Sequence, residues 1–178
     1  MTGGTFRIEP LTSDHDVRQF DCGRESLNLF LHRYALMSKS QGLSQTWVAV
    51  AEPKQVLAYY TLGFVSIDRE GATPRVGKGV PNYQIPCVLL ARLAVDRSVQ
   101  GQGIGGHVLE TAMRRAVALG NASMASDNTP VPPLRAMLVH AIDETAAGFY
   151  RKYGFESSPT DPLHLLILLK DLRKSLRL

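Results

Sequence analysis

Predominantly apolar stretches recur along the chain and predict its strands. They are residues 5–9, 45–51, 56–67, 87–95, 134–140 and 163–169. Apolar and polar side chains alternate in 45–51, which is typical of a strand with one buried face. Residues 56–67 are apolar almost throughout, as in a strand that is buried on both faces. The turn Glu52-Pro53-Lys54 lies between these two stretches and predicts that they pair as an antiparallel hairpin.

Apolar residues at helical spacing predict four helices. The helical segments are 14–20, which follows Ser13 as a helix cap, 24–40, the segment that carries Val108, Ala112 and Ala116, and 143–153, which ends before Gly154. Two polar connections, 68–84 and 120–133, are predicted to be loops. The first contains several basic residues, and loops beside a cleft often carry recognition residues.

This order of elements, β-α-α-β-β-β-α-β-α-β, predicts the fold class. We expect one α+β domain over residues 1–178, with a central mixed, mostly antiparallel sheet flanked by helices. A chain of 178 residues is long enough to bury a substantial core without disulfides or metals. No internal repeat, low-complexity segment or linker interrupts it.

Cysteine content, apolar runs and net charge indicate the cellular compartment and the kind of partner. Cys22 and Cys87 are far apart and form no metal-binding spacing, which favours a reducing compartment and no metal site. The N-terminal residues do not resemble a signal peptide, and no apolar run is long enough for a membrane helix, so we expect a cytoplasmic protein. The chain has 20 Lys and Arg against 16 Asp and Glu. This excess of positive charge suits a polyanionic partner or a phosphate-bearing cofactor.

A glycine-rich loop follows the strand 87–95. Four of the seven residues in Gln100-Gly101-Gln102-Gly103-Ile104-Gly105-Gly106 are glycine, and a helical pattern begins directly after them. Glycine permits positive φ and close approach of a ligand to the main chain. The first N–H groups of a helix have no intrahelical partner and lie at the positive end of its dipole. The loop is therefore predicted to bind phosphate.

Two nucleotide-binding motifs fail on their context. Gly101-x-Gly103-x-x-Gly106 fits a dinucleotide fingerprint, but no strand precedes Asp127, the acidic residue at about the required distance. A Walker loop requires Gly-Lys-Ser/Thr, whereas His107 and Val108 follow Gly106.

A third pattern, Gln/Arg-x-x-Gly-x-Gly/Ala, is met by Gln100, Gly103 and Gly105 after the LARLAVD strand. It resembles the acetyl-CoA signature of the GNAT acetyltransferase superfamily. The resemblance extends to the order of elements and to the segments FDCGRESLNLFLHRYA, LVHAID and FYRKYGFESSPTDPLHLLILLKDL. These segments are similar to the GNAT toxins of bacterial toxin–antitoxin pairs.

The resemblance implies an activity and its partners. GNAT toxins acetylate the α-amino group of aminoacyl-tRNA with acetyl-CoA and so block translation. They are inhibited by a small ribbon-helix-helix antitoxin, and the resemblance suggests a homodimer. The same cofactor residues also fit a GNAT enzyme of a small amine or a protein N-terminus, or a module that only binds acyl-CoA.

The resemblance also implies the roles of individual residues. Main-chain groups at the end of the strand are expected to pair with the pantetheine arm and the loop to hold the pyrophosphate, which gives the cofactor set Leu93, Ala94, Val95, Gln100, Gly101, Gln102, Gly103, Ile104, Gly105 and Gly106. Tyr150 is the expected catalytic residue, which supports the leaving sulfur; the alternative is a core aromatic. His140, at a strand end, is a candidate for orienting the acceptor or a structural histidine.

The type of acceptor also follows from pKa values. A free α-amino group has a pKa of about 7.7–8.0, so about a tenth is neutral near pH 7, whereas a lysine amine at about 10.4 needs a general base. No acidic residue or histidine in the sequence is evident as such a base, which favours an α-amine. Basic residues are the candidates for contacts to tRNA phosphates: Arg33, Lys39, Arg75, Lys78, Arg92 and Arg97, and at the tail Lys170, Arg173, Lys174 and Arg177.

Overall fold

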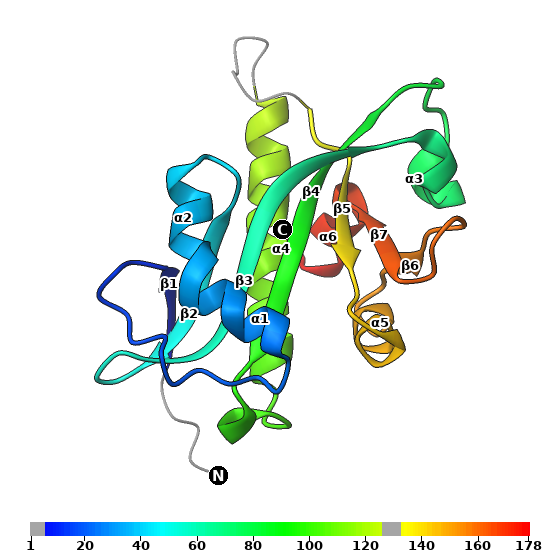
Figure 1. Cartoon of the computed structure of the whole chain (residues 1–178). Coiled ribbons are helices and arrows are strands. Elements are labelled where there is room, and N and C mark those ends of the chain that lie inside the picture. Colours follow the sequence, from blue (N-terminus) through cyan, green and yellow to red (C-terminus); the bar gives the residue numbers. More distant parts are fainter. Residues whose placement is uncertain (1–5, 126–132) are drawn as a thin grey trace. The chain divides into compact units, whose positions relative to one another are not determined.

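A computed structural model describes residues 6–125 and 133–178 (Figure 1). Its strands are β1 (Arg7–Pro10), β2 (Gln45–Ala51), β3 (Gln55–Ile67), β4 (Ile85–Val95), β5 (Ala136–His140), β6 (Glu156–Ser157) and β7 (His164–Leu168). They form one sheet in the order β1-β2-β3-β4-β5-β7-β6. The β4–β5 pair is parallel, whereas β1–β2, β2–β3, β5–β7 and β6–β7 are antiparallel. The predicted mixed, mostly antiparallel sheet is confirmed, as is the hairpin of β2 and β3.

Helices connect these strands. They are α1 (Glu25–Leu29), α2 (Ala35–Ser40), α3 (Pro74–Gly77), α4 (Ile104–Met124), α5 (Glu144–Arg151) and α6 (Leu169–Ser175). One π-helical turn, η1 (Phe30–Tyr34), joins α1 to α2, so the predicted helix 24–40 is one helical stretch with a wide turn in its middle. Two 3₁₀ turns, η2 (Arg69–Gly71) and η3 (Arg97–Val99), complete the set.

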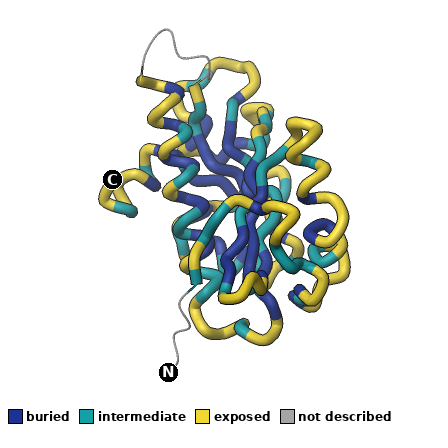
Figure 2. Tube along the Cα trace, turned by 90° about the vertical axis from the view of Figure 1, so that its left-hand side faces the viewer, coloured by how far each residue is buried: buried dark blue, intermediate teal, exposed yellow. Residues whose placement is uncertain are grey.

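The described residues fall into two compact parts. The first part comprises residues 6–63 and 91–112, and the second comprises 64–90, 113–125 and 133–178. Elements β3, β4 and α4 each contribute residues to both parts. In both parts buried residues lie on strands and on helices, and the turns are mainly exposed (Figure 2).

The core of the first part centres on Tyr59. This β3 residue is fully buried, and its hydroxyl donates a hydrogen bond to the Leu27 carbonyl at 2.8 Å. Its ring contacts Phe20 edge-on and Phe30 in a stacked geometry. On its other side, Phe30 lies under the guanidinium of Arg92, 3.7 Å from the ring centroid, a cation–π contact. These contacts fix the helical stretch 25–40 to the strands of this part.

The core of the second part centres on β5. Ala136 to Val139 are all buried, because β5 pairs with β4 on one side and β7 on the other. Cys87, Leu138 and Leu166 belong to one apolar cluster, which Val76 of α3 joins. A strand with neighbours on both sides and buried faces has to be apolar throughout, which explains why this segment was recognisable in the sequence.

Three sequence predictions were wrong. Residues 14–20 form turns instead of a helix; the main-chain N–H of Asp16 donates to the Lys54 carbonyl, and so short a helix gains little without packing along its length. The predicted loop 68–84 contains α3, which Pro74 begins and the Thr73 side chain caps. The final strand ends at Leu168, because Leu169 already begins α6.

Smaller differences concern element ends. The short strand β6 was not predicted. Helix α4 continues to Met124, into the predicted loop 120–133, of which residues 126–132 lie outside the described part, as does Thr5 of the first predicted strand. Among residues 6–125 and 133–178, the structure contains no helix with the length and apolar character needed to cross a bilayer.

Candidate functional site

The end of β4 offers main-chain groups to a ligand. Pairing with β5 runs from Cys87 to Leu90, and β4 continues to Val95 beyond the last paired residue. The Ala94 side chain is buried in the core of the first part. Ala94 therefore anchors the strand with its side chain, while the peptide groups of Leu93, Ala94 and Val95 are not used by the β5 ladder.

The glycine loop has the backbone conformation that its sequence predicts. Gly101 and Gly103 have φ values of 76° and 84°, and an added Cβ at either would meet open space. Residues with side chains rarely adopt such φ values, so glycine is needed here for its backbone freedom. Residues 101–103 are exposed, which leaves their main chain accessible to a ligand.

Helix α4 begins inside the motif. Its first helical hydrogen bond runs from the His107 N–H to the Gly103 carbonyl. The N–H groups of Ile104, Gly105 and Gly106 precede this bond and have no partner within the helix. Together with the positive end of a helix of 21 residues, they form a site for an anion such as a pyrophosphate.

The Gln100 side chain holds the loop in place. Its Nε2 group donates hydrogen bonds to the Val95 carbonyl at 2.8 Å and to the Cys22 carbonyl at 3.0 Å. The motif's glutamine thus ties the loop to the end of β4 and to the segment before α1. We name this arrangement the Gln100 brace.

Two carboxylates extend the Gln100 brace. Asp96 accepts hydrogen bonds from the Asp21 N–H and the Ser98 N–H, both at 2.9 Å. Burial opposes ionisation of Asp96, but these hydrogen bonds outweigh it and lower its pKa. Asp21 in turn accepts from the Gly23 N–H and from the Asn28 amide, which lower its pKa. Both carboxylates are therefore ionised acceptors at neutral pH.

Tyr150 lies on α5 in the second part. The Asp143 side chain caps this helix by accepting from the Ala146 N–H at 2.9 Å, and Gly154, with φ of 90°, follows its end. The Tyr150 ring contacts Phe149 and Phe155 edge-on and is 6% exposed.

The Tyr150 hydroxyl is a neutral donor. Burial raises the pKa of this phenol well above its usual value. Among the described residues it has no hydrogen-bond partner, and no polar side-chain atom there is both sealed from solvent and unpaired. The hydroxyl therefore reaches accessible space, where it can donate to a ligand.

Comparisons with known proteins agree with this geometry. Residues 42–157 match the sequence model of the acetyltransferase (GNAT) domain. The chain belongs to the GNAT family. It is 41% identical over 158 residues, 89% of each chain, to a protein of Mycobacterium tuberculosis (strain ATCC 25618 / H37Rv) named tRNA-acetylating toxin.

Solved GNAT structures also resemble it. The structure of AtaT complexed with acetyl-methionyl-tRNAfMet has a TM-score of 0.83 and 32% identity, with 96% of this chain and 99% of that one covered. A mutant AtaT toxin bound to the C-terminus of the antitoxin AtaR and acetyl-CoA has a TM-score of 0.77 and 29% identity, with 98% and 99% covered. The predicted resemblance to GNAT toxins is confirmed.

In this GNAT chain His140 is paired with another histidine. It ends β5 opposite His164 of β7, and the two rings stack with centroids 4.0 Å apart. Burial and His164 lower the pKa of His140, although Asp161 opposes this effect. His140 therefore favours its neutral form, and its orienting role stays a prediction.

The basic residues predicted to contact tRNA belong to both parts, and their role stays a prediction. Arg33 and Lys39 are exposed on η1 and α2 of the first part. Arg92 lies over Phe30, and Arg97 forms an ion pair with Asp21 at 3.2 Å. Arg75 and Lys78 belong to the second part, where Arg75 pairs with Asp171.

The Gln100 brace was not predicted from the sequence. Cys22 and Gln100 are 78 residues apart in the sequence, and Asp21 and Asp96 are 75 residues apart. The single local signal is Asp96 after a strand and two residues before Ser98, a spacing typical of a capping aspartate.

A first prediction concerns the glycine conformation. Gly103→Ala is expected to lower the free energy of unfolding by about 1 kcal/mol because of its positive φ, and to raise KM for acetyl-CoA about fivefold or more, the factor equivalent to about 1 kcal/mol. Gly42→Ala is the matched control, since Gly42 has φ of 70° and open space around it. It should lose similar stability with an unchanged KM; an equal rise in KM would contradict the assignment.

A second prediction tests the Gln100 brace without cofactor. Gln100→Glu places a carboxylate against two carbonyl oxygens and is expected to cost about 2–3 kcal/mol in denaturant unfolding. Gln102→Glu adds the same charge nearby but removes only one hydrogen bond, to Ser98, of 3.3 Å. It should cost less than about 1 kcal/mol. Equal losses in the two variants would show that Gln100 does not hold the loop.

Proposed function

We propose that this GNAT enzyme transfers an acetyl group from acetyl-CoA to the α-amino group of aminoacyl-tRNA, and so blocks translation as a toxin. The observation that carries the proposal is the open, positive-φ glycine loop at the start of α4, in a chain 41% identical to a tRNA-acetylating toxin. The loop supports the proposed cofactor site, and the name of the relative supports tRNA as the proposed acceptor.

Main-chain groups do most of the cofactor binding in this proposal. Peptide groups of Leu93 and Val95 pair with the amide-bearing pantetheine arm in the manner of an added strand. The amides of Gly101 to Gly106 bind the pyrophosphate, and the Gln100 brace keeps them oriented before the ligand arrives. When bound, acetyl-CoA supplies an activated thioester carbon for attack by the amine.

Tyr150 is the proposed catalytic residue. Attack by a neutral amine forms a bond between its nitrogen and the acetyl carbon and breaks the bond between that carbon and sulfur. Negative charge collects on the sulfur, and the proton that the nitrogen loses passes through solvent to the released thiolate. A phenol of raised pKa is a poor proton donor to a thiolate, whose pKa is about 8.5. We therefore propose that the Tyr150 hydroxyl stabilises the sulfur by donating a hydrogen bond.

The acceptor supplies its own nucleophile. Because an α-amine has a pKa near neutrality, a useful fraction is unprotonated without a general base. His140, which favours its neutral form, is the proposed group that accepts a hydrogen bond from this amine. Charged tRNA is present in the cytoplasm, where we propose that the enzyme acts.

Two assembly properties belong to the same proposal. The enzyme forms a homodimer, and a ribbon-helix-helix antitoxin inhibits it. The mutant AtaT structure with the C-terminus of AtaR supports an antitoxin partner.

Tyr150→Phe is expected to cut turnover about 10²–10⁴-fold, because the donor to the sulfur is lost. Its affinity for acetyl-CoA should stay within about twofold, because the ring and its packing on Phe149 and Phe155 are retained. Single-turnover kinetics and calorimetric binding separate these effects. Tyr153→Phe, on a ring that also contacts Phe149, is the control and should keep normal turnover. A normal rate in Tyr150→Phe removes Tyr150 from the mechanism.

The substrate is tested with radiolabelled acetyl-CoA. Label should appear on bulk charged tRNA and not on deacylated tRNA, since only the former carries an α-amine. Label on polyamines or protein N-termini alone would instead identify a different GNAT acceptor. Binding of acetyl-CoA without transfer to any of them would identify a binding module.

A further inference from the structure

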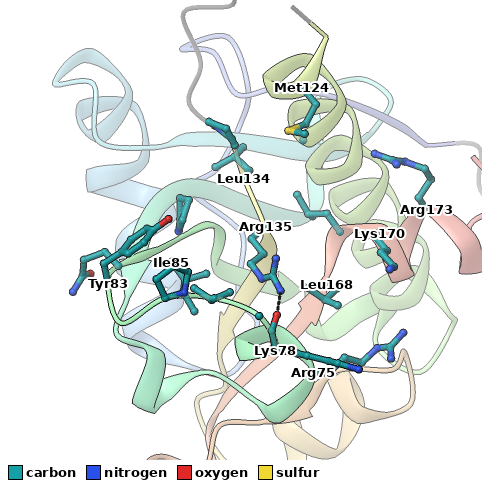
Figure 3. A pocket seen from close by; sticks show the side chains of 18 residues that line it. Arg75, Lys78, Tyr83, Ile85, Met124, Leu134, Arg135, Leu168, Lys170 and Arg173 are labelled. Carbon is teal, nitrogen blue, oxygen red and sulfur yellow. Dashed lines mark hydrogen bonds between the residues drawn. The ribbon is translucent and has the colours of Figure 1, made fainter. Parts of the chain in front are cut away.

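The second part contains a large hollow of about 1080 Å³ (Figure 3). It lies among the segment from α3 to the start of β4, the C-terminal end of α4, the start of β5 and the start of α6. Of the residues that the structure describes, five basic ones and no aspartate or glutamate line it: Arg75, Lys78, Arg135, Lys170 and Arg173. We name it the cationic hollow.

Most of its positive charge is not neutralised within the described structure. Arg75 donates to Asp171 at 2.7 Å, so its charge is matched. Lys78 and Lys170 are exposed and have no ion-pair or hydrogen-bond partner among the described residues. Arg135 and Arg173 bind only neutral acceptors there. Lys78, Lys170, Arg135 and Arg173 therefore line a space to which residues 6–125 and 133–178 contribute no acidic side chain, and only Lys170 among them interacts electrostatically with Asp171.

The arginines are held in position by these neutral acceptors. The Arg135 guanidinium donates to the Val76 carbonyl at 2.6 Å and to the Lys78 carbonyl at 2.9 Å. Arg173 donates to the Asn121 side-chain oxygen. A guanidinium has five N–H donors, so each keeps donors for a ligand while its own freedom is already reduced.

Aromatic and apolar surface lies beside these charges. Tyr83 is 65% exposed and Met124 70% exposed, although both are large side chains. In Figure 3 Tyr83 lies on the opposite side of the hollow from Lys170 and Arg173. A flat exposed ring beside cations is the combination that binds an unpaired base and its phosphates.

We propose that the cationic hollow binds the sugar–phosphate backbone of the tRNA substrate, close to its acceptor end. Lys78, Lys170, Arg135 and Arg173 contact phosphates, and Tyr83 stacks on a base. This inference rests on the proposed function. It gives the tRNA a second region of contact besides the reacting amine. It also adds Arg135 to the basic residues that were predicted from the sequence to contact tRNA.

The position within the second part fits an extended substrate. Arg135 directly precedes β5, whereas His140 ends it and α5 with Tyr150 follows. Five strand residues span about 17 Å, which equals about five nucleotides at about 3.4 Å per nucleotide along a strand. A tRNA whose amine lies at Tyr150 is long enough to reach the hollow.

The observations favour RNA over an acidic peptide. Both would match the charge, but a nucleic acid presents one charge per nucleotide at regular spacing together with flat bases. That pattern uses the exposed Tyr83 as well as the separated cations. A peptide with carboxylates accounts for the cations only.

The test compares wild type with Lys78→Ala/Lys170→Ala, which changes two exposed side chains that form no hydrogen bond or ion pair with the described residues. Binding of fluorescent bulk charged tRNA is measured by anisotropy from low to high salt. Each lost phosphate contact should weaken binding roughly eightfold at about 0.1 M salt and reduce the slope of log K against log salt by about one. KM for acetyl-CoA should not change.

Lys54→Ala is the matched control, an exposed lysine in the β2–β3 turn, and it should bind like wild type. Tyr83→Ala should weaken binding with an unchanged salt slope, because stacking involves no charge. The proposal is overturned if the double variant binds tRNA like wild type. It is also overturned if the double variant keeps its affinity for tRNA and loses only its affinity for an acidic peptide. Failure of the proposed function looks different, since wild type would then not acetylate charged tRNA.

Discussion

Hydrogen bonds to Gln100 and Asp96 are the interactions on which the cofactor site depends. A loop that exposes its amides to a ligand has few contacts of its own, since residues 101–103 are exposed and an added Cβ at Gly101 or Gly103 would touch nothing. The residues that precede the loop must therefore hold it in position. Gln100 does so by donating hydrogen bonds to two main-chain carbonyls, and Asp96 by accepting hydrogen bonds from two main-chain N–H groups. Because the residues before the loop are held by hydrogen bonds, the loop itself can stay exposed. Little conformational entropy of the loop then has to be lost when a cofactor binds.

The two sets of functional groups use opposite physical strategies. The loop leaves main-chain N–H groups exposed to solvent at the positive end of a long helix, an arrangement that suits an anion. Tyr150 is buried among aromatic rings, which keeps its proton on the phenol. A donor that stays protonated at neutral pH suits a place where negative charge develops, because it carries no negative charge of its own that would repel the developing one.

Local patterns allowed much of the fold and the cofactor loop to be predicted from the sequence. Strand β5 is apolar because it has neighbours on both sides, and Gly103 is glycine because its φ is positive. Predictions failed where the same local pattern suits two structures: the apolar run that ends β7 continues into α6 without a break, since Leu169 is buried in either state. The Gln100 brace and the cationic hollow join residues far apart in sequence, such as Arg135 and Val76, and no short-range pattern encodes them.

The two compact parts also constrain how the chain acquires its structure. Each part is assembled from segments that are separated in sequence, and β3, β4 and α4 belong to both. The first part is incomplete until residue 112 has left the ribosome, and β5 lacks its second neighbour until β7 has followed. Domains generally fold as units during synthesis, so the first part can complete its structure before α5, which carries Tyr150, has been made. The glycine loop can therefore form earlier in synthesis than the helix that carries Tyr150.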